Sequence, residues 1–285
     1  MRFAFIRRHT GEFPLDVMCR VLEVSASGYY AWRHRPESRR SREDRRLLLE
    51  IRAIHRQSRR RYGSPRVHHE LRGRGFRCGR HRVARLMRDD GLEGTFRRRF
   101  RVTTDSKHRW PVASNRLARQ FEVSRPDTVW AGDITYIPTR GGWLYLAVLL
   151  DLCSRRVVGW AMSPRLGRRL PLAALEMATG RRRPRASILH HSDRGSQYAS
   201  KDYRQALSDE GFVVSMSRRG DCYDNAPVES FFATLKKELV AGEVFYTREQ
   251  ARREIVDYIE SFYNSWRRHS ALGYLSPAAF EEQVA

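Results

Sequence analysis

Apolar residues recur with a helical period through the first part of the chain. Residues 13–22, 25–32 and 41–58 each place apolar side chains three or four positions apart, which is typical of amphipathic helices. Ser25 stands at the start of the second of these segments and is a typical N-cap residue. We expect a helical region over residues 1–58 with a helix-turn-helix outline, although any small helical bundle gives the same pattern.

A second pair of helices is expected in the next forty or so residues. Ser64-Pro65 is a typical helix start, the sequence Gly-Arg-Gly at 73–75 predicts a turn, and residues 80–87 have apolar positions at helical spacing. A short helix, a turn and a second helix with a basic face match a DNA-binding helix-turn-helix, whereas an ordinary solvated helix face is the alternative. The candidate DNA contacts on this face are Arg80, Arg82, Arg85 and Arg88.

The apolar period changes after residue 126. Runs of β-branched, aromatic and aliphatic residues predict strands, and amphipathic segments between and after them predict helices. The expected strands are 128–139, 143–150, 155–162, 187–191 and 212–216, and the expected helices are 170–179, 200–210 and 225–240. Three antiparallel strands followed by crossover units form the ribonuclease-H-like arrangement. We therefore expect an α/β domain with a five-stranded mixed sheet flanked by helices, preceded by small all-α modules.

The charge of the chain is large and unevenly distributed. The net charge is +23; residues 1–110 hold 30 Lys and Arg against 12 Asp and Glu, and the remaining 175 residues hold 25 against 20. A concentrated basic excess favours a polyanionic partner. Basic membrane anchors carry a defined apolar stripe, which the pattern here does not favour. We expect double-stranded DNA as the partner and no membrane association.

Cysteine spacing and the apolar runs favour a cytoplasmic protein. Cys19, Cys78, Cys153 and Cys222 lie far apart, which favours reduced thiols over disulfides or a zinc knuckle. The longest uninterrupted apolar run, residues 143–150, is too short to span a bilayer. No long apolar stretch follows the N-terminal arginines, so a signal peptide is not expected.

Three acidic residues are the candidate chemistry. Asp133 lies within the first expected strand, Asp193 follows the fourth, and Glu229 lies one turn into the helix that starts at Asn225. The first and fourth strands are neighbours at the centre of such a sheet, so we expect these carboxylates to meet at one end of it. On local grounds alone, Asp151 remains an alternative to Asp133, and Asp221 and Asp224 remain alternatives to Glu229.

A carboxylate cluster of this kind predicts a metal site. Like charges repel and are stable together only when cations neutralise them. Hard oxygen ligands suit Mg²⁺ or Mn²⁺, and two such ions roughly 3.5–4 Å apart can hold the attacking and leaving oxygens of a phosphoryl displacement. His190 and His191 are not usual ligands for Mg²⁺. We expect His190 to be a buried strand residue and His191 to shape the loop before Asp193.

Lys236 is a further candidate. It follows Glu229 by seven residues, close to two helical turns, so the two side chains share a face of the expected helix. Lysine is rare in this arginine-rich chain, where 51 of the 55 basic residues are arginines. An exposed helix lysine is the alternative interpretation. Phe231 and Leu235 lie on the opposite stripe and are expected in the core.

The sequence around these acids resembles a known family. Asp193 begins Asp-Arg-Gly-Ser-Gln-Tyr, Glu229 lies in Gly-Asp-Cys-Tyr-Asp-Asn-Ala-Pro-Val-Glu-Ser-Phe-Phe, and Leu-Lys-Lys-Glu follows. Thirty-five residues separate Asp193 from Glu229. This pattern resembles the DDE transposases of the retroviral-integrase superfamily, and most closely the second-frame product of the third insertion-sequence family. The resemblance covers nearly the whole chain, including the motif from Tyr263 to Tyr274.

The resemblance implies roles for particular residues and partners. It implies a transposase that cuts and joins DNA at terminal inverted repeats, acts as a homo-oligomer on DNA, and works with an upstream-frame product or as a fusion with it. A DNA-binding regulator without activity and a nuclease of the same fold are the alternatives. The resemblance implies Asp133, Asp193 and Glu229 as catalytic ligands of two Mg²⁺ or Mn²⁺ ions, and Lys236, Arg267 and His269 as DNA contacts.

The same pattern suggests four segments. Residues 1–58 form an N-terminal helical region, residues 59–96 a second helix-turn-helix-like module, residues 97–125 a basic linker, and residues 126–285 an integrase-type catalytic domain with a C-terminal helical motif.

Overall fold

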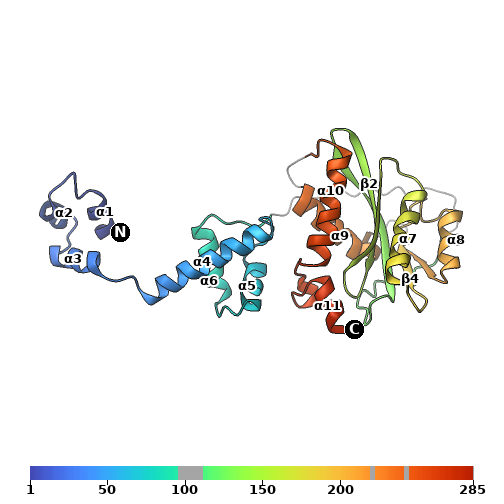
Figure 1. Cartoon of the computed structure of the whole chain (residues 1–285), viewed down its shortest axis with the longest axis horizontal. Coiled ribbons are helices and arrows are strands. Elements are labelled where there is room, and N and C mark those ends of the chain that lie inside the picture. Colours follow the sequence, from blue (N-terminus) through green and yellow to red (C-terminus); the bar gives the residue numbers. More distant parts are fainter. Residues whose placement is uncertain (96–111, 219–221, 241–243, 285) are drawn as a thin grey trace.

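The computed structural model describes residues 1–95, 112–218, 222–240 and 244–284. Figure 1 shows an elongated molecule in which the N-terminal helices lie at one end and a β-sheet with its helices at the other. The helices of the first part are α1 (Arg2–Arg8), α2 (Leu15–Val21), α3 (Ala26–His34), α4 (Arg39–Gln57), α5 (Ser64–Gly73) and α6 (Arg80–Asp89).

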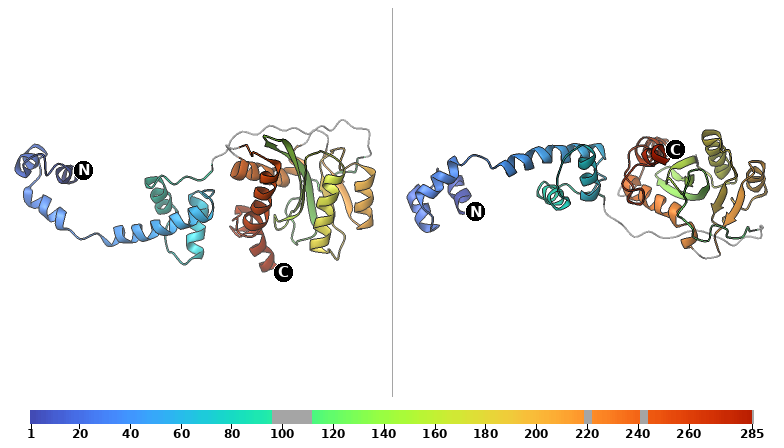
Figure 2. Two further views of the ribbon diagram at one scale, coloured as in Figure 1. Left: turned by 45° about the horizontal axis from the view of Figure 1, so that its top comes forward. Right: turned by 90° about the horizontal axis from the view of Figure 1, so that it is seen from below.

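The first three helices form a unit with its own small core. Ile6, Met18, Cys19 and Tyr29 are buried together there, and Ser25 caps α3 by accepting a hydrogen bond from the Gly28 amide. Both views in Figure 2 place this unit far from the sheet, at the end of the long helix α4. The expected helices are present, and α1 is an addition that the sequence pattern did not predict.

Helices α4, α5 and α6 pack together into a second helical unit, here called the α4–α6 module. Its core joins Leu47, Ile51 and Ile54 of α4 to apolar residues of the two shorter helices, such as Leu71 and Val83. Helix α4 falls within the expected first segment, residues 1–58, yet its apolar face is covered by the second. The expected domain boundaries remain a prediction.

The second part of the chain contains a five-stranded mixed sheet in the order β3-β2-β1-β4-β5. The β1–β2 and β2–β3 pairs are antiparallel, while β1–β4 and β4–β5 are parallel. Gly142 starts the second strand with φ of 100°, a conformation that favours glycine at the hairpin turn. The strands are β1 (Val129–Thr139), β2 (Gly142–Asp151), β3 (Val157–Ser163), β4 (Leu189–Ser192) and β5 (Val213–Met216).

Helices cover both faces of this sheet (Figure 1). Helices α7 and α8 pack on one face around Trp130 and Leu175, and α9 and α10 pack on the other around Phe231 and Ile255. The elements are α7 (Arg169–Arg182), α8 (Lys201–Asp209), η1 (Cys222–Asn225), α9 (Ala226–Leu235), the π-helix η2 (Lys236–Val240), α10 (Arg248–Asp257), the π-helix η3 (Tyr258–Asn264), η4 (Ser270–Leu272) and α11 (Pro277–Val284). The predicted ribonuclease-H-like integrase architecture is confirmed.

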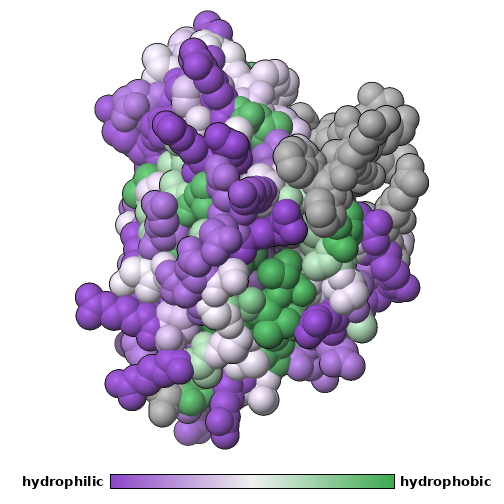
Figure 3. Space-filling model, turned by 90° about the vertical axis from the view of Figure 1, so that its right-hand side faces the viewer, coloured by the Kyte–Doolittle hydropathy of each residue, from purple (hydrophilic) through white to green (hydrophobic). Residues whose placement is uncertain are grey.

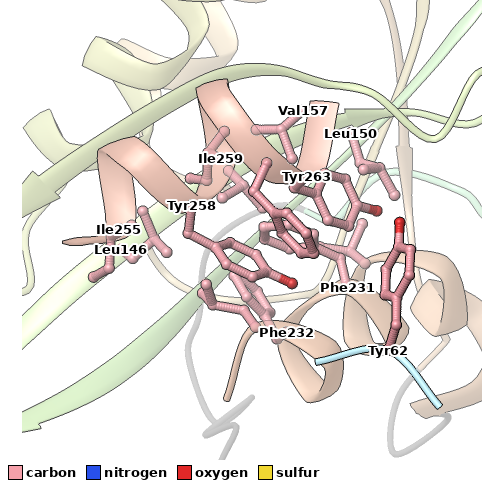
Figure 4. Packing of buried hydrophobic residues seen from close by; sticks show 14 of the residues in the cluster. Tyr62, Leu146, Leu150, Val157, Phe231, Phe232, Ile255, Tyr258, Ile259 and Tyr263 are labelled. Atoms are coloured by element: carbon pink, nitrogen blue, oxygen red, sulfur yellow. The ribbon is translucent and has the colours of Figure 1, made fainter. Parts of the chain in front are cut away.

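The α4–α6 module docks on the C-terminal helices of the sheet domain. Tyr62, just before α5, stacks on Trp266 with ring centroids 4.8 Å apart. Its hydroxyl accepts a hydrogen bond from the Arg268 amide. Figure 4 shows Tyr62 beside the cluster that contains Phe231 and Tyr263, whose rings meet edge to face. The two parts therefore share one continuous apolar core.

Two local expectations need correction. Asn225 occupies the N-cap position of α9, but its side chain makes no capping hydrogen bond; it donates instead to the carbonyl of Gly132. The helix expected to run to Val240 changes to a π-helix after Leu235. Of the expected linker, residues 97–111 lie outside the described residues, while Leu117 is buried and its amide donates to Ser215.

The face of the molecule at the sheet end is mainly hydrophilic. Figure 3 shows charged and polar side chains over most of one end, around a smaller apolar patch. None of the helices in the described part of the chain combines the length and the apolar character needed to cross a bilayer.

Candidate active site

The strand register brings Asp133 and Asp193 side by side. In the parallel β1–β4 pair, Gly132 lies opposite Ser192, so the residues that follow each of them stand next to one another. Strand β4 ends at Ser192, and Asp193 is the first residue beyond it. Both aspartates are half-buried, neither sealed in the core nor fully in solvent. The expectation that the first and fourth strands are central neighbours is confirmed.

Helix α9 brings Glu229 to the same end of the sheet. The Asn225 side chain ties the start of this helix to β1, because its Nδ2 donates to the Gly132 carbonyl over 3.2 Å. Glu229 follows four residues later, about one helical turn along. Val228 and Phe232 on either side of it are buried against the sheet, which holds the glutamate on a face that is only half-buried.

The electrostatics link these side chains into one site. Burial raises the pKa of Asp133 well above its usual range, and the negative charges of Asp193 and Glu229 raise it further. Burial and Asp193 likewise raise the pKa of Glu229. Burial lowers the pKa of Lys236 to about 8, although Asp133 opposes the shift. The three carboxylates therefore repel one another, beside a lysine that is mainly protonated at neutral pH.

The backbone orients both aspartates. Oδ1 of Asp133 accepts a hydrogen bond from the Ile134 amide over 2.7 Å, and Oδ1 of Asp193 accepts one from the Gly195 amide over 2.9 Å. A Cβ on Gly195 would lie 2.9 Å from Oδ1 of Asp193, so glycine is needed for this approach. Among the described residues, no group of three or more His, Cys, Asp or Glu side chains is closed enough to hold a metal ion.

The donor set nevertheless fits a hard divalent cation. The negative charge of Asp193 raises the pKa of both Asp133 and Glu229, and a bound divalent ion would relieve the repulsion among these three half-buried carboxylates. Oxygen donors are the ligands that Mg²⁺ and Mn²⁺ prefer. The residues that would hold the ion are Asp133, Asp193 and Glu229.

The alternative acids have structural partners. Asp151 is fully buried, and its carboxylate accepts hydrogen bonds from the amides of Asp127, Cys153 and Ser154 in the turn after β2. Asp224 is fully buried as well, where Arg218 and Arg119 lower the pKa of its carboxyl. These two acids shape turns and loops. Asp221 lies outside the described residues.

The two histidines before Asp193 are buried and neutral. Nε2 of His190 lies 2.9 Å from the Tyr203 hydroxyl, and burial lowers the pKa of this histidine to about 3. His191 contacts the hydroxyls of Ser215 and Ser217, and burial lowers its pKa to about 4. His190 lies in the strand as expected. The expectation that His191 shapes the loop is wrong, because it is a central residue of β4.

The arginines of α6 divide into two pairs. Arg82 and Arg85 both contact Asp44 of α4, over 2.5 and 2.6 Å, and so join the two helices. Arg80 and Arg88 are exposed. The predicted DNA-facing row is therefore reduced: two of its members hold the module together, while the other two keep their side chains toward solvent.

The two C-terminal residues expected to contact DNA are buried in the structure. Arg267 was expected to contact phosphate, but it is 5% exposed and binds the Glu238 carboxylate through two nitrogens over 2.8–3.1 Å. The ring of His269 packs edge to face on Tyr263. Burial lowers the pKa of His269 to about 2, so the ring is neutral. Both residues brace the C-terminal helices and we do not retain them as DNA contacts.

Two tyrosines near the acids had been assigned no role from the sequence. Tyr198 is 3% exposed, and burial raises its pKa well above the usual range, with Asp133 and Asp193 adding to the shift. Tyr136 is half-buried, and the same two aspartates raise its pKa beyond the effect of burial and Tyr145. Tyr198 is the last residue of the Asp-Arg-Gly-Ser-Gln-Tyr motif, and this position was the feature of the sequence that could have indicated its place near the acids.

Comparison with known proteins first defines the class. The family model "Integrase core domain" matches residues 123–222, and a second model of that name matches residues 229–284. The model "HTH-like domain" matches residues 41–100, which include α4, α5 and α6. These matches and the sheet order identify an integrase core joined to a helix-turn-helix-like domain.

Curated relatives then define the family. "Transposase InsF for insertion sequence IS3A" of Escherichia coli (strain K12) is 45% identical over 285 residues, which is 99% of each chain. "Insertion element IS600 uncharacterized 31 kDa protein" of Shigella sonnei is 47% identical over 266 residues, 93% of this chain and 98% of that one. The chain belongs to the IS3 family of DDE transposases, as its motifs indicated.

Solved structures of low sequence identity are also similar. A simian T-cell lymphotropic virus intasome in complex with PP2A regulatory subunit B56 gamma is 15% identical, with a TM-score of 0.47 over 81% of this chain and 74% of that one. The HTLV-2 integrase catalytic core domain in complex with magnesium (trimeric form) is 14% identical, with a TM-score of 0.42 over 55% of this chain and 97% of that one.

Proposed function

We propose that this transposase cuts DNA at the ends of its insertion sequence and joins the freed 3′-hydroxyl to another strand, using divalent metal ions held by Asp133, Asp193 and Glu229. The observation that carries the proposal is the mutual repulsion of these carboxylates where β4 ends beside Asp133 of β1. The relatives named as transposases support the biological role. The site acts on double-stranded DNA in the cytoplasm, within a homo-oligomer.

The residues of the site have different roles in this proposal. The two aspartates and the glutamate supply hard oxygen ligands, and two bound Mg²⁺ or Mn²⁺ ions would stabilise the attacking and leaving oxygens of an in-line phosphoryl displacement. Lys236 is mainly protonated beside Asp133, so its ammonium can donate to a phosphate next to the scissile one. The amides of Ile134 and Gly195 hold the aspartates in place.

The test is a strand-transfer assay with oligonucleotide duplexes that carry the element end. Asp133→Asn, Asp193→Asn and Glu229→Gln should each remove several kcal/mol of transition-state stabilisation, which lowers the rate by about a thousandfold or more. Asp202→Asn, at an exposed acid of α8 paired with Arg168, is the matched control and should retain activity.

Each alternative function has its own outcome. Metal-dependent nicking without joined product would identify a nuclease, and DNA binding without metal-dependent product would identify a regulator. Activity that depends on adding an upstream-frame product would show that the chain needs that partner. Parent-like activity in all three acid variants would refute the site.

A further inference from the structure

A cleft separates the α4–α6 module from the sheet domain. Its volume is about 500 Å³. Three parts of the chain line it: Arg61 and residues 63–66 at the start of α5, residues of α6 and the segment after it between 84 and 95, and Lys237, Ser270 and Tyr274 of the sheet domain. The cleft therefore exists only because the module docks on the C-terminal helices.

The lining of this cleft is strongly basic. Arg61, Arg66, Arg88 and Lys237 contribute four cations, of which Arg66 also pairs with Glu238 outside the lining at 3.7 Å. Among the described lining residues Glu93 contributes the single carboxylate. Arg88 is exposed and Lys237 is half-buried, so both are accessible from solvent, while Arg61 is 6% exposed and lies in the wall. Such an excess of fixed positive charge in a cleft favours an anion.

One of the wall arginines is incompletely satisfied. Nε of Arg61 donates to the Glu238 carbonyl over 3.1 Å, and its guanidinium lies 4.6 Å from the centre of the Phe262 ring. Its Nη1 is buried and has no hydrogen-bond partner among the described residues. An unsatisfied buried donor is costly, and an anion in the cleft would offset that cost by its charge.

The start of α5 supports the same chemistry. The N-cap residue of this ten-residue helix is Gly63, so no side chain caps the first-turn amides. Gly63, Ser64 and Pro65 line the cleft beside the arginines. Uncapped helix N-termini carry partial positive charge and bind phosphate groups, so the backbone and the cations favour the same ligand.

The cleft borders the helical segment that also carries Lys236, a neighbour of the acidic site. Lys237 lines the cleft, and its neighbour Lys236 lies close enough to Asp133 for their charges to interact. The Cα atoms of consecutive residues are about 3.8 Å apart. The cleft and the acidic site are therefore linked through two consecutive residues of η2, Lys237 at the cleft and Lys236 at Asp133.

We propose that the cleft binds consecutive backbone phosphates of the element-end DNA strand as it passes from the α4–α6 module to the carboxylates. The inference rests on the proposed strand-transfer function and adds the path by which the substrate enters. Arg88 and Lys237 contact phosphates from opposite walls, one from the module and one from the sheet domain. One bound strand would therefore contact both the module and the sheet domain.

The test measures DNA binding in EDTA, so that it does not depend on catalysis. The probe is a fluorescent duplex taken from the DNA that flanks the coding sequence, titrated by anisotropy over a series of salt concentrations. Arg88→Ala and Lys237→Ala should each weaken binding about tenfold and reduce the log–log salt slope by about 0.9, the value for one lost phosphate contact.

Matched controls come from the other side of the sheet. Arg169 and Lys201 are exposed residues at the starts of α7 and α8. Arg169→Ala and Lys201→Ala should keep the affinity and slope of the parent. Circular dichroism melts of all four variants confirm that each is folded.

A second measurement locates the contact on the DNA. Duplexes with a neutral methylphosphonate at successive positions near the end should bind the parent more weakly at two or more adjacent positions. The Arg88→Ala/Lys237→Ala double variant should lose this sensitivity at those positions alone.

The outcomes distinguish DNA binding by the cleft from catalysis at the acidic site. Variants that match their controls in affinity and slope would overturn the proposal. Binding of inorganic phosphate or pyrophosphate in the cleft would also overturn it if the variants bound DNA as the parent does. Metal-dependent cleavage by the parent is measured in a separate assay. A failure of the proposed strand-transfer function would therefore leave the result of the DNA-binding test unchanged.

Discussion

The buried ion pair between Arg267 and Glu238 offers a sharp test of the structure. Arg267 lies in a motif where a basic residue could contact DNA, but its side chain is 6% exposed and that of Glu238 is 3% exposed. We consider the substitution Arg267→Met, which keeps most of the length of the side chain and removes its charge.

The magnitude follows from what the substitution leaves behind. Glu238 would keep a hydrogen bond from the Tyr258 hydroxyl over 2.8 Å and a more distant ion pair with Arg66 at 3.7 Å. It would lose the two nitrogens of Arg267 that neutralise its charge. Breaking one side of a buried ion pair costs about 3–5 kcal/mol, and the remaining partners place the expected loss near the lower end, about 3 kcal/mol.

The assay is urea unfolding followed by circular dichroism, completed by a double-mutant cycle. Glu238→Leu combined with Arg267→Met should recover part of the lost stability, because no buried charge remains unpaired. Arg39→Met breaks an exposed pair with Glu43 within α4 and should cost about 0.5 kcal/mol or less. DNA affinity of folded Arg267→Met should keep the salt slope of the parent, since the guanidinium does not reach the surface.

Two results would refute this reasoning. A loss of stability no larger than that of Arg39→Met would mean that the pair behaves as an exposed one. A shallower salt slope for Arg267→Met would mean that its guanidinium contacts phosphate after all.

Three further predictions concern stability. Asp133→Asn should stabilise the metal-free protein at neutral pH by on the order of 1 kcal/mol, because it removes one of the repelling carboxylates; an unchanged or lower melting temperature would contradict the mutual repulsion. Burial raises the pKa of Glu238, but Arg267, Arg66 and the Tyr258 hydroxyl together lower it below its usual value. Its contribution is therefore complete above about pH 4.5 and is lost as pH falls through its folded pKa, so melts between pH 3 and 6 should fall more steeply for the parent than for Glu238→Gln. Gly159→Ala in β3 should cost at least about 1–3 kcal/mol, because the new Cβ would lie 2.2 Å from the Ala174 carbonyl oxygen of α7. Gly180→Ala in α7 meets nothing within 4 Å and should be neutral or stabilising by up to about 1 kcal/mol. Equal melting temperatures for these two glycine variants would contradict the packing of α7 on β3.

The sequence by itself determined the sheet and the acidic candidates. The strands of the core are buried stretches of β-branched and aliphatic residues, and their order leaves few topologies. Asp133 and Asp193 could be placed because each is defined by the strand it sits in or follows, and Glu229 because it is one turn into a helix. These are local properties, which a linear pattern records well.

Only the tertiary structure showed which acidic and basic side chains are paired with one another inside the protein. The carboxylate of Asp224 is bound by Arg119, a residue more than 100 positions earlier in the chain, which argues against Asp224 as a metal ligand. Arg82 and Arg85 are tied to Asp44 across two helices. Their roles depend on which charges lie nearby in space, and sequence separation carries no information about that.

The C-terminal motif and the cleft show the same limit most clearly. The sequence marked Arg267 as a basic residue in a recognisable motif, but burial beside Glu238 made it part of the framework. The cleft brings together Arg88 of the α4–α6 module and Lys237 of the sheet domain, which are far apart in the sequence. Ion pairing and burial decide whether an arginine is available to DNA, because a charge neutralised inside the protein cannot also bind a phosphate, and only packing between distant segments sets that outcome.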